Sequence, residues 1–256
     1  MGQSGGGPLS RRDALGVGAA GLVALVAGCG TTVSSAPRSR PAPAPTTTAT
    51  TTSAPVGGPA VQVARGTSGR PEVALTFHGA GDLGIARQIH DELAAANAKA
   101  TIMAVGTWVA ANPDGVRMFR DAGHDIGNHT WSHGVLSSMS TPTIRGEIER
   151  CRDALVAALG TPGSFFRQSA AQAATRQELV EAGLAGYPRA LSYDIDGLDW
   201  QDPGPTVIRA AVATATAGSV VSLHLGHHGT VTALPGILAD LTARGLTPVT
   251  ATGLLR

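Results

Sequence analysis

Between residues 73 and 251, short apolar runs alternate with longer amphipathic stretches, and this alternation constrains the fold more than any other feature of the sequence. The short runs have the length of buried strands, whereas the longer stretches carry apolar residues at helical spacing and end at glycines. The predicted strands are 73–77, 101–105, 125–127, 164–167, 191–195, 220–224 and 247–251. The predicted helices are 83–96, 108–122, 142–159, 172–182, 205–217 and 232–243.

Seven strands interleaved with helices predict an α/β fold with a parallel sheet, because parallel strands need crossover connections and helices usually supply them. The number of strands is typical of an incomplete barrel. A doubly wound sheet is the alternative. In a barrel of parallel strands, the loops that follow the strands meet on one face, and functional residues are expected there.

Residues 1–28 have the form of a bacterial export signal. Arg11 and Arg12 precede an uncharged apolar run at 16–27, which is shorter than the roughly 20 residues of a membrane span. The arginine pair is typical of twin-arginine export. Small residues before Cys29 resemble the lipobox of lipoproteins, in which the cysteine is acylated. We therefore expect an exported protein whose lipid anchor is its only membrane contact, on the outer face of the cell membrane; a buried, unmodified helix is the alternative.

Residues 29–60 are expected to form a disordered stalk between this anchor and a folded domain at 61–256. The stretch from 30 to 59 holds six prolines and eight threonines, no acidic residue and no apolar periodicity. Such a composition buries too little apolar surface to offset the chain entropy lost on folding. The predicted organisation is thus a signal, a lipidated stalk that lifts the domain into the cell-wall space, and one domain.

The charge of the domain excludes a nucleic-acid-binding function. The whole chain has a net charge of +1, but residues 1–60 contribute four arginines and one aspartate, so residues 61–256 carry −2. A slightly acidic domain lacks the basic surface that nucleic acids require. Two cysteines do not form a disulfide framework; Cys29 is the predicted lipid anchor and Cys151 a lone thiol in a helix.

Polar residues follow the predicted strands at the positions where a barrel gathers its site. They are His78, His129, His133, Arg167, Asp194, Asp196, Asp199, Trp200 and His224. The other histidines are interpreted as a surface helix residue (His90), a turn residue (His124) and solvated loop residues (His227 and His228).

His129 and His133 are the sharpest single feature. Two imidazoles four residues apart on one helical turn point the same way, as a divalent metal with two fixed nitrogen ligands requires. The alternative is a capped helix start with one histidine satisfied internally. The position of the pair directly after a predicted strand favours the metal site.

The domain resembles the polysaccharide deacetylases of the NodB-homology type, carbohydrate esterase family four, from Val73 to Leu255. The family's second motif, H-[ST]-x-x-H after E-I-G-N, matches residues 125–133, and its fourth, D-x-x-D-W, matches 196–200. Its fifth, L-x-L-H-D, matches 221–224, with Leu225 in place of the final aspartate, and residues 98–106 resemble its K-A-T-F-F-x-x-G strand. The resemblance implies a distorted, incomplete (β/α)7 barrel.

The resemblance also implies roles for single residues. A divalent metal, zinc with cobalt or nickel as alternatives, would bind His129 and His133, and His224 would protonate the leaving amine. Arg167 and Asp199 would form an ion pair that orients the base or His224, and Trp200 would wall the sugar pocket. A purely structural ion pair and core packing of Trp200 are the alternatives. Trp131 is left out of the site.

The first motif departs from the family pattern. Where the family has T-F-D-D-G-P, with a general base and a metal ligand, this chain has no carboxylate at residues 76–81. In one reading His78 is the third metal ligand and Asp82 the base; in another His78 is the base, and Asp82 or water completes the metal shell. In a third reading the site is inactive. Asp82 as a simple helix cap is the structural alternative. The third motif is likewise reduced, to residues 167–170.

The predicted function is metal-dependent removal of N-acetyl groups from cell-wall or other N-acetylated polysaccharide. Hydrolysis of O-acetyl esters on polysaccharide uses the same apparatus and is the first alternative. An inactive, glycan-binding surface lipoprotein is the second alternative, and a purely structural surface protein is a third.

Overall fold

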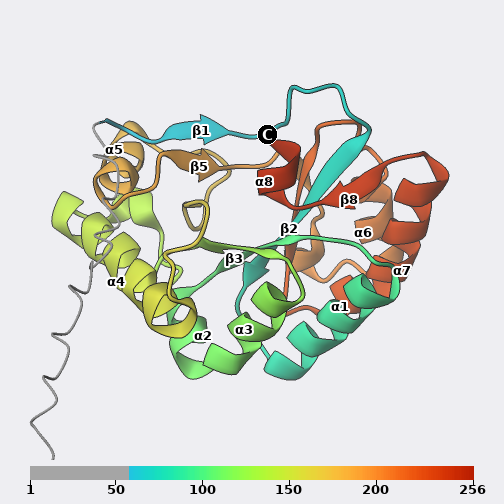
Figure 1. Ribbon diagram of the computed structural model, residues 1–256, viewed down its shortest axis with the longest axis horizontal. Coiled ribbons are helices and arrows are strands. Elements are labelled where there is room, and N and C mark those ends of the chain that lie inside the picture. The colour runs from blue at the N-terminus through green and yellow to red at the C-terminus, as the bar shows by residue number, and fades with distance from the viewer. Residues whose placement is uncertain (1–57) are drawn as a thin grey trace, which may run out of the picture. The chain divides into compact units, whose positions relative to one another are not determined.

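The computed structural model describes residues 58–256, which form one α/β unit built on a parallel sheet (Figure 1). The predictions for the export signal, for acylation of Cys29 and for most of the stalk fall on residues 1–57 and lie outside the described residues. Within residues 58–256, no helix has the length and apolar character that crossing a membrane requires.

The strands form an open, distorted barrel around β2. Six of them are hydrogen-bonded in parallel, with β4, β3, β2, β7 and β6 in that order and β8 beside the start of β2. The separate pair β1 and β5 is linked to β4 through two parallel bridges at Phe166. The predicted incomplete barrel is therefore confirmed. The strands are β1 (Val61–Val63), β2 (Glu72–Gly79), β3 (Thr101–Ala104), β4 (Asp125–Asn128), β5 (Arg189–Leu191), β6 (Ile195–Asp196), β7 (Val220–His224) and β8 (Thr247–Val249).

Helices cover the outside of the sheet, and the largest apolar cluster lies between the two (Figure 1). Apolar side chains of β2 and β7 pack there against those of α1 and α7. The helices are α1 (Leu83–Ala95), α2 (Gly106–Ala111), α3 (Pro113–Asp121), α4 (Thr141–Leu159), α5 (Arg176–Leu184), α6 (Pro205–Val212), α7 (His228–Ala243) and α8 (Ala251–Leu254), with short 3₁₀ turns at Leu136–Ser138 and Asp199–Gln201.

Several predicted elements differ in their limits. The predicted helix 108–122 is two helices, because Pro113 lacks an N–H and begins a new helix at the first position, where none is needed. The predicted strand 164–167 is reduced to the bridges at Phe166, and 191–195 is divided between β5 and β6. Helix α5 begins at Arg176 because Thr175 and Glu178 form a capping box, which leaves residues 168–174 as a loop.

The alternation of side chains along β2 and β7 directs polar groups to the inside of the barrel. Leu75 and Phe77 face the helices, as do Val221 and Leu223, and all four are fully buried. The intervening residues lie opposite one another across the two strands, Thr76 beside Ser222 and His78 beside His224. The carboxyl ends of β2 and β7 thus place two histidines side by side.

Candidate active site

A cavity of about 380 Å³ opens at the carboxyl ends of the central strands. Its lining combines histidines from two strands and one loop with aromatic, polar and small side chains. Its lining residues are His78, His133, Ala170, Ala171, Gln172, Tyr193, Asp196, Trp200, Ser222 and His224. The structure therefore brings together most of the residues that the sequence places after the strands.

Three histidines at this cavity form a group that fits a metal ion. One ligand atom from each of His78, His129 and His133 lies within 4.8 Å of the others, and no second group of this kind occurs among residues 58–256. His129 Nδ1 lies 3.1 Å from the carbonyl oxygen of Arg167, so it must carry the proton, because a carbonyl only accepts. Nε2 of His129 is therefore the atom with a free lone pair, and it lies 3.1 Å from Nδ1 of His78.

Burial keeps this cluster neutral. Desolvation is the main reason why the pKa values of His78 and His129 lie well below 6.5, and the other histidines of the cluster lower them further. Burial also lowers the pKa of His133. Because a metal binds the unprotonated imidazole, the cluster is in its ligand form at neutral pH. The donor set and the charge state thus both fit a divalent ion.

The segment that carries His129 and His133 is an irregular loop, and the predicted helical turn is wrong. Thr130 and His133 both have positive φ, 65° and 60°, which a helix does not allow. The loop is held from α4, where the buried carboxylate of Glu147 accepts hydrogen bonds from the backbone N–H and the hydroxyl of Ser132 at 2.8 and 3.0 Å. Both imidazoles nevertheless reach the cluster, as predicted.

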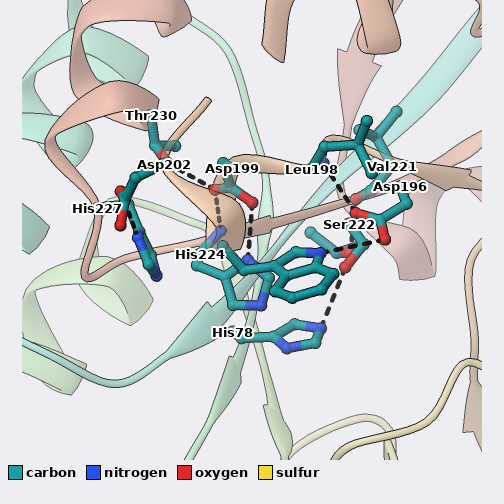
Figure 2. A network of polar contacts seen from close by, with 12 residues as sticks. His78, Asp196, Leu198, Asp199, Asp202, Val221, Ser222, His224, His227 and Thr230 are labelled. Carbon is teal, nitrogen blue, oxygen red and sulfur yellow. Dashed lines mark hydrogen bonds and ion pairs between the residues drawn. The ribbon is translucent and has the colours of Figure 1, made fainter. Parts of the chain in front are cut away.

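His224 has a different environment on the same cavity. Its Nδ1 lies 2.8 Å from Oδ1 of Asp199, and its backbone N–H donates to Oδ2 at 2.7 Å (Figure 2). The Asp199 side chain is fully buried, and the hydroxyl of Thr230 donates to it at 2.5 Å. The carboxylate fixes the proton of His224 on Nδ1 and leaves Nε2 available for proton transfer.

The predicted ion pair between Arg167 and Asp199 is wrong. Arg167 is fully buried, and its guanidinium donates to the carbonyl oxygens of Leu191 and Ser192 and to the hydroxyl of Thr76 at 2.6 to 3.2 Å. Asp199 is occupied by His224 and Thr230. Burial lowers the pKa of Arg167 to about 9, which still leaves it charged at neutral pH. Arg167 contributes to the site through its carbonyl oxygen, which orients His129.

Asp82 lies outside the cluster, contrary to the readings that made it a base or a ligand. Its Oδ1 accepts from the backbone N–H groups of Gly84 and Ile85 at 2.7 and 3.1 Å, which caps α1. The preceding loop is fixed, because Trp108 donates to the carbonyl of Gly81 at 3.1 Å. Gly81 has φ 97°, and a Cβ there would lie 2.5 Å from the backbone of Gly226. The loop therefore does not bring Asp82 inward.

Trp200 lines the cavity and is 52% exposed, so the sugar-wall interpretation fits its position better than core packing. Its indole N–H donates to Asp196 at 3.3 Å. The sequence places Asp196 after a strand but assigns it no role, and it does not identify Tyr193 or Ser222 as site residues. Ser222 could have been found from period-two alternation, since it precedes His224 by two residues; the loop residues 170–172 carry no comparable signal.

The remaining histidines and the free thiol lie outside the cavity lining. His124 directly follows a turn and is buried, accepting from the backbone N–H of Ala100 at 3.0 Å, and burial lowers its pKa to about 4. His90 is half-buried on α1, and His227 bonds Asp202 at 2.8 Å. Cys151 lies in helix α4, as predicted, and it is buried, which raises its pKa to about 12.

Comparison with known proteins gives consistent matches. The family model "Polysaccharide deacetylase" matches residues 65–187. A peptidoglycan-N-acetylglucosamine deacetylase of Bacillus cereus is 30% identical over 197 residues, covering 72% of this chain and 88% of the relative. A peptidoglycan-N-acetylglucosamine deacetylase of Listeria monocytogenes is 28% identical over 179 residues, covering 70% of this chain; the match spans only 37% of that relative.

Solved structures show the same fold. One is a mutant of a carbohydrate esterase family four pseudoenzyme whose enzymatic activity was restored. It superposes with a TM-score of 0.71 at 26% identity, covering 77% of this chain and 71% of the other. The similar proteins thus include named deacetylases and a mutant of a pseudoenzyme with restored activity.

Proposed function

This chain belongs to the polysaccharide deacetylase family, and on that premise we propose that it is a metal-dependent hydrolase that removes N-acetyl groups from cell-wall or other N-acetylated polysaccharide. One observation carries the proposal. The neutral three-histidine cluster and the pair of Asp199 and His224 meet at one cavity, with the rings of His78 and His224 only 4.3 Å apart. A ligand group and a proton carrier thus adjoin the same substrate-sized space.

The metal would be held by His78, His129 and His133, with zinc as the first candidate and cobalt or nickel as alternatives. Such an ion supplies Lewis-acid polarisation of a carbonyl and lowers the pKa of a water. The orientation of His78 supports its role as a ligand, since Nδ1 faces His129. Of the two active readings of the altered first motif, the geometry favours the one with three histidine ligands.

The proposed role of His224 is to carry the proton of the reaction. With His78 engaged in the cluster and Asp82 capping α1, Nε2 of His224 accepts a proton from the attacking water and donates it to the leaving nitrogen as the carbon–nitrogen bond breaks. Asp199 holds the ring and compensates the charge while the proton resides there. The products are acetate and the free amine of the sugar.

Gly79, the position of the family's second first-motif carboxylate, leaves no room for a side chain in this structure. The family's second carboxylate corresponds to Gly79, and a Cβ at Gly79 would lie 2.9 Å from Cα of Ala104 on β3. Any side chain there forces the two strands to shift. We infer that His78 replaces the lost ligand from the neighbouring position.

The exposed indole of Trp200 and the cavity beside it support a glycan as the occupant, because sugar rings stack on aromatic faces. Peptidoglycan and chitin-like oligomers are the proposed substrates, in line with the names of the relatives. An O-acetyl ester is the alternative substrate. A glycan-binding protein without activity is the alternative function, and the pseudoenzyme among the similar structures is a precedent for the loss of activity.

We propose the location from the sequence alone. Arg11, Arg12 and the apolar run before Cys29 support export by the twin-arginine route and acylation of Cys29. The domain would then act in the cell-wall space, tethered to the outer face of the membrane, where peptidoglycan is within reach of a stalk of about thirty residues.

The test uses the full chain loaded in turn with zinc, cobalt and nickel. Acetate release is measured on N-acetylglucosamine oligomers, on peptidoglycan and on an O-acetylated polysaccharide, together with the metal content. We expect one metal per chain and acetate from an N-acetylated substrate, both lost in His129→Ala and both kept in the control His90→Ala. Acetate from the O-acetylated polysaccharide alone identifies an esterase. Glycan binding without acetate release from any substrate contradicts the enzymatic proposal.

A further inference from the structure

Ser222 lies beside the cluster of His78, His129 and His133. It is on β7, opposite Thr76 of β2 and two residues before His224, and its side chain is 1% exposed. Its Oγ lies 3.2 Å from Nε2 of His78, and the dashed line in Figure 2 marks this contact. The hydroxyl therefore contacts the one cluster histidine that comes from the altered first motif.

The two ring nitrogens of His78 face different partners. Nδ1 faces Nε2 of His129 at 3.1 Å, and Nε2 faces Ser222. Since Nε2 of His129 carries a lone pair, Nδ1 of His78 donates to it, and Nε2 of His78 accepts from the serine hydroxyl. No other hydrogen bond to Nε2 of His78 is formed within residues 58–256.

This arrangement changes when His78 serves as a ligand. Its Nδ1 must then offer a lone pair, so the proton moves to Nε2, which becomes a donor. A hydroxyl rotates to donate or accept, so Ser222 can hold His78 in both tautomers without moving. A carbonyl could serve only the second tautomer. The second nitrogen of His129 is held in a comparable way, but by a carbonyl: the Arg167 carbonyl accepts from Nδ1 and therefore permits only one tautomer.

We infer that Ser222 is a positioning residue of the metal site, whose hydroxyl holds Nε2 of His78 and thereby aims Nδ1 at His129 and His133. The inference rests on the proposed function, since it assumes that the three histidines bind a metal. Groups that hold the second nitrogen of a ligand histidine fix its orientation and raise its basicity, and removing them weakens metal binding about 10- to 100-fold. Without the hydroxyl, the His78 ring is free to turn away from the cluster.

The test compares Ser222→Val with Ser222→Thr in the full chain. The two variants have nearly the same shape and share the added branch, but only threonine keeps the hydroxyl. We expect zinc affinity, measured by competition with a chromophoric chelator, to fall about 10- to 100-fold in Ser222→Val and to stay much closer to wild type in Ser222→Thr. The visible spectrum of the cobalt form should change in Ser222→Val and not in Ser222→Thr.

A double variant separates positioning from general packing. In a His78→Ala background, Ser222→Val should cause no further loss of zinc affinity, because the group it orients is gone. Ser222→Ala, which adds no branch, repeats the comparison if the valine variant does not fold. Melting of the metal-free proteins checks that the fold is kept.

The outcomes distinguish the two proposals. A wild-type chain that binds no metal overturns the proposed function. A wild-type chain that binds zinc while Ser222→Val and Ser222→Ala bind it equally well overturns the inference alone. Equal weakening in the threonine and valine variants would mean that the branch, not the hydroxyl, matters, and also overturns it. Unchanged zinc affinity with lost acetate release would make Ser222 a catalytic residue instead.

Discussion

Two histidine environments share one cavity and differ in what surrounds them. The cluster of His78, His129 and His133 is held by neutral groups, namely a carbonyl, a hydroxyl and the other imidazoles. His224 is held by the buried carboxylate of Asp199, although its ring lies only 4.3 Å from that of His78. The same side chain is therefore placed in two electrostatic settings a few ångströms apart.

The surroundings of each histidine, rather than the residue type, therefore determine which chemical role it can take. Burial without a counter-charge disfavours the imidazolium, so the cluster stays unprotonated and suited to a cation. Asp199 instead holds the proton of His224 on Nδ1, which leaves Nε2 available for proton transfer. Substitutions in the cluster should therefore change metal binding, whereas substitutions of His224 or Asp199 should change kcat and leave metal binding intact.

Removing His224 should produce the largest effect on turnover with no effect on metal binding. Loss of a general acid–base group costs about 10²- to 10⁴-fold in rate, so kcat of His224→Ala should fall by that factor while one metal per chain remains. His129→Ala should lose both, because it removes a ligand. Acetate release and metal content measured on the same preparations check this. Loss of metal in His224→Ala would mean that the two environments are not separate.

Removing the charge of Asp199 should weaken turnover less. Asp199→Asn keeps the shape but loses the charge-assisted hydrogen bond to His224, which contributes about 1.5–3 kcal/mol, or roughly 10- to 150-fold in rate. The effect should appear in kcat, with metal affinity unchanged. Thr230→Val is the matched control, since it removes another bond to Asp199 but leaves the carboxylate in place. A larger loss in Thr230→Val than in Asp199→Asn would contradict the role given to the charge.

Acid should destabilise the metal-free protein through its buried histidines. Their folded-state pKa values lie below the unfolded value of 6.5, so below pH 6.5 the unfolded chain binds protons that the folded chain does not. Stability is therefore greatest above pH 6.5 and falls as the pH decreases, by at most about 1.4 kcal/mol per pH unit for each such histidine. Urea unfolding between pH 7.5 and 5 measures the slope.

His124 provides the matched control for that slope, because it lies outside the cavity and its own window runs from 6.5 down to about 4. His124→Gln should make the slope shallower and leave metal content and turnover unchanged. A slope that is the same in wild type and His124→Gln, or stability that rises on acidification, would contradict the assignment of buried neutral histidines.

The sequence predicts much of this site because strand ends and side-chain alternation are local properties. The limits of β7 agree with the prediction, and His78, His129, His133 and His224 meet, as expected from their positions at the strand ends. The partners of Arg167 and the course of the loop before Asp82 could not be predicted. They depend on carbonyls at Leu191 and Ser192 and on the packing of Gly81 against Gly226, which only the folded chain brings together.

Substitutions of Asp82 should have the smallest effect on activity, and they test whether Asp82 takes any part in metal binding or catalysis. Because its carboxylate caps α1, Asp82→Ala should lower the free energy of unfolding by about 0.5–2 kcal/mol, and Asp82→Ser, which can still cap, should restore most of that loss. Metal affinity and kcat should equal the wild-type values in both variants. Chemical unfolding, zinc titration and acetate release give the three measurements. If kcat fell about 100-fold in both variants, the serine would have rescued the cap but not the chemistry, and Asp82 would be the base that the helix cap argues against.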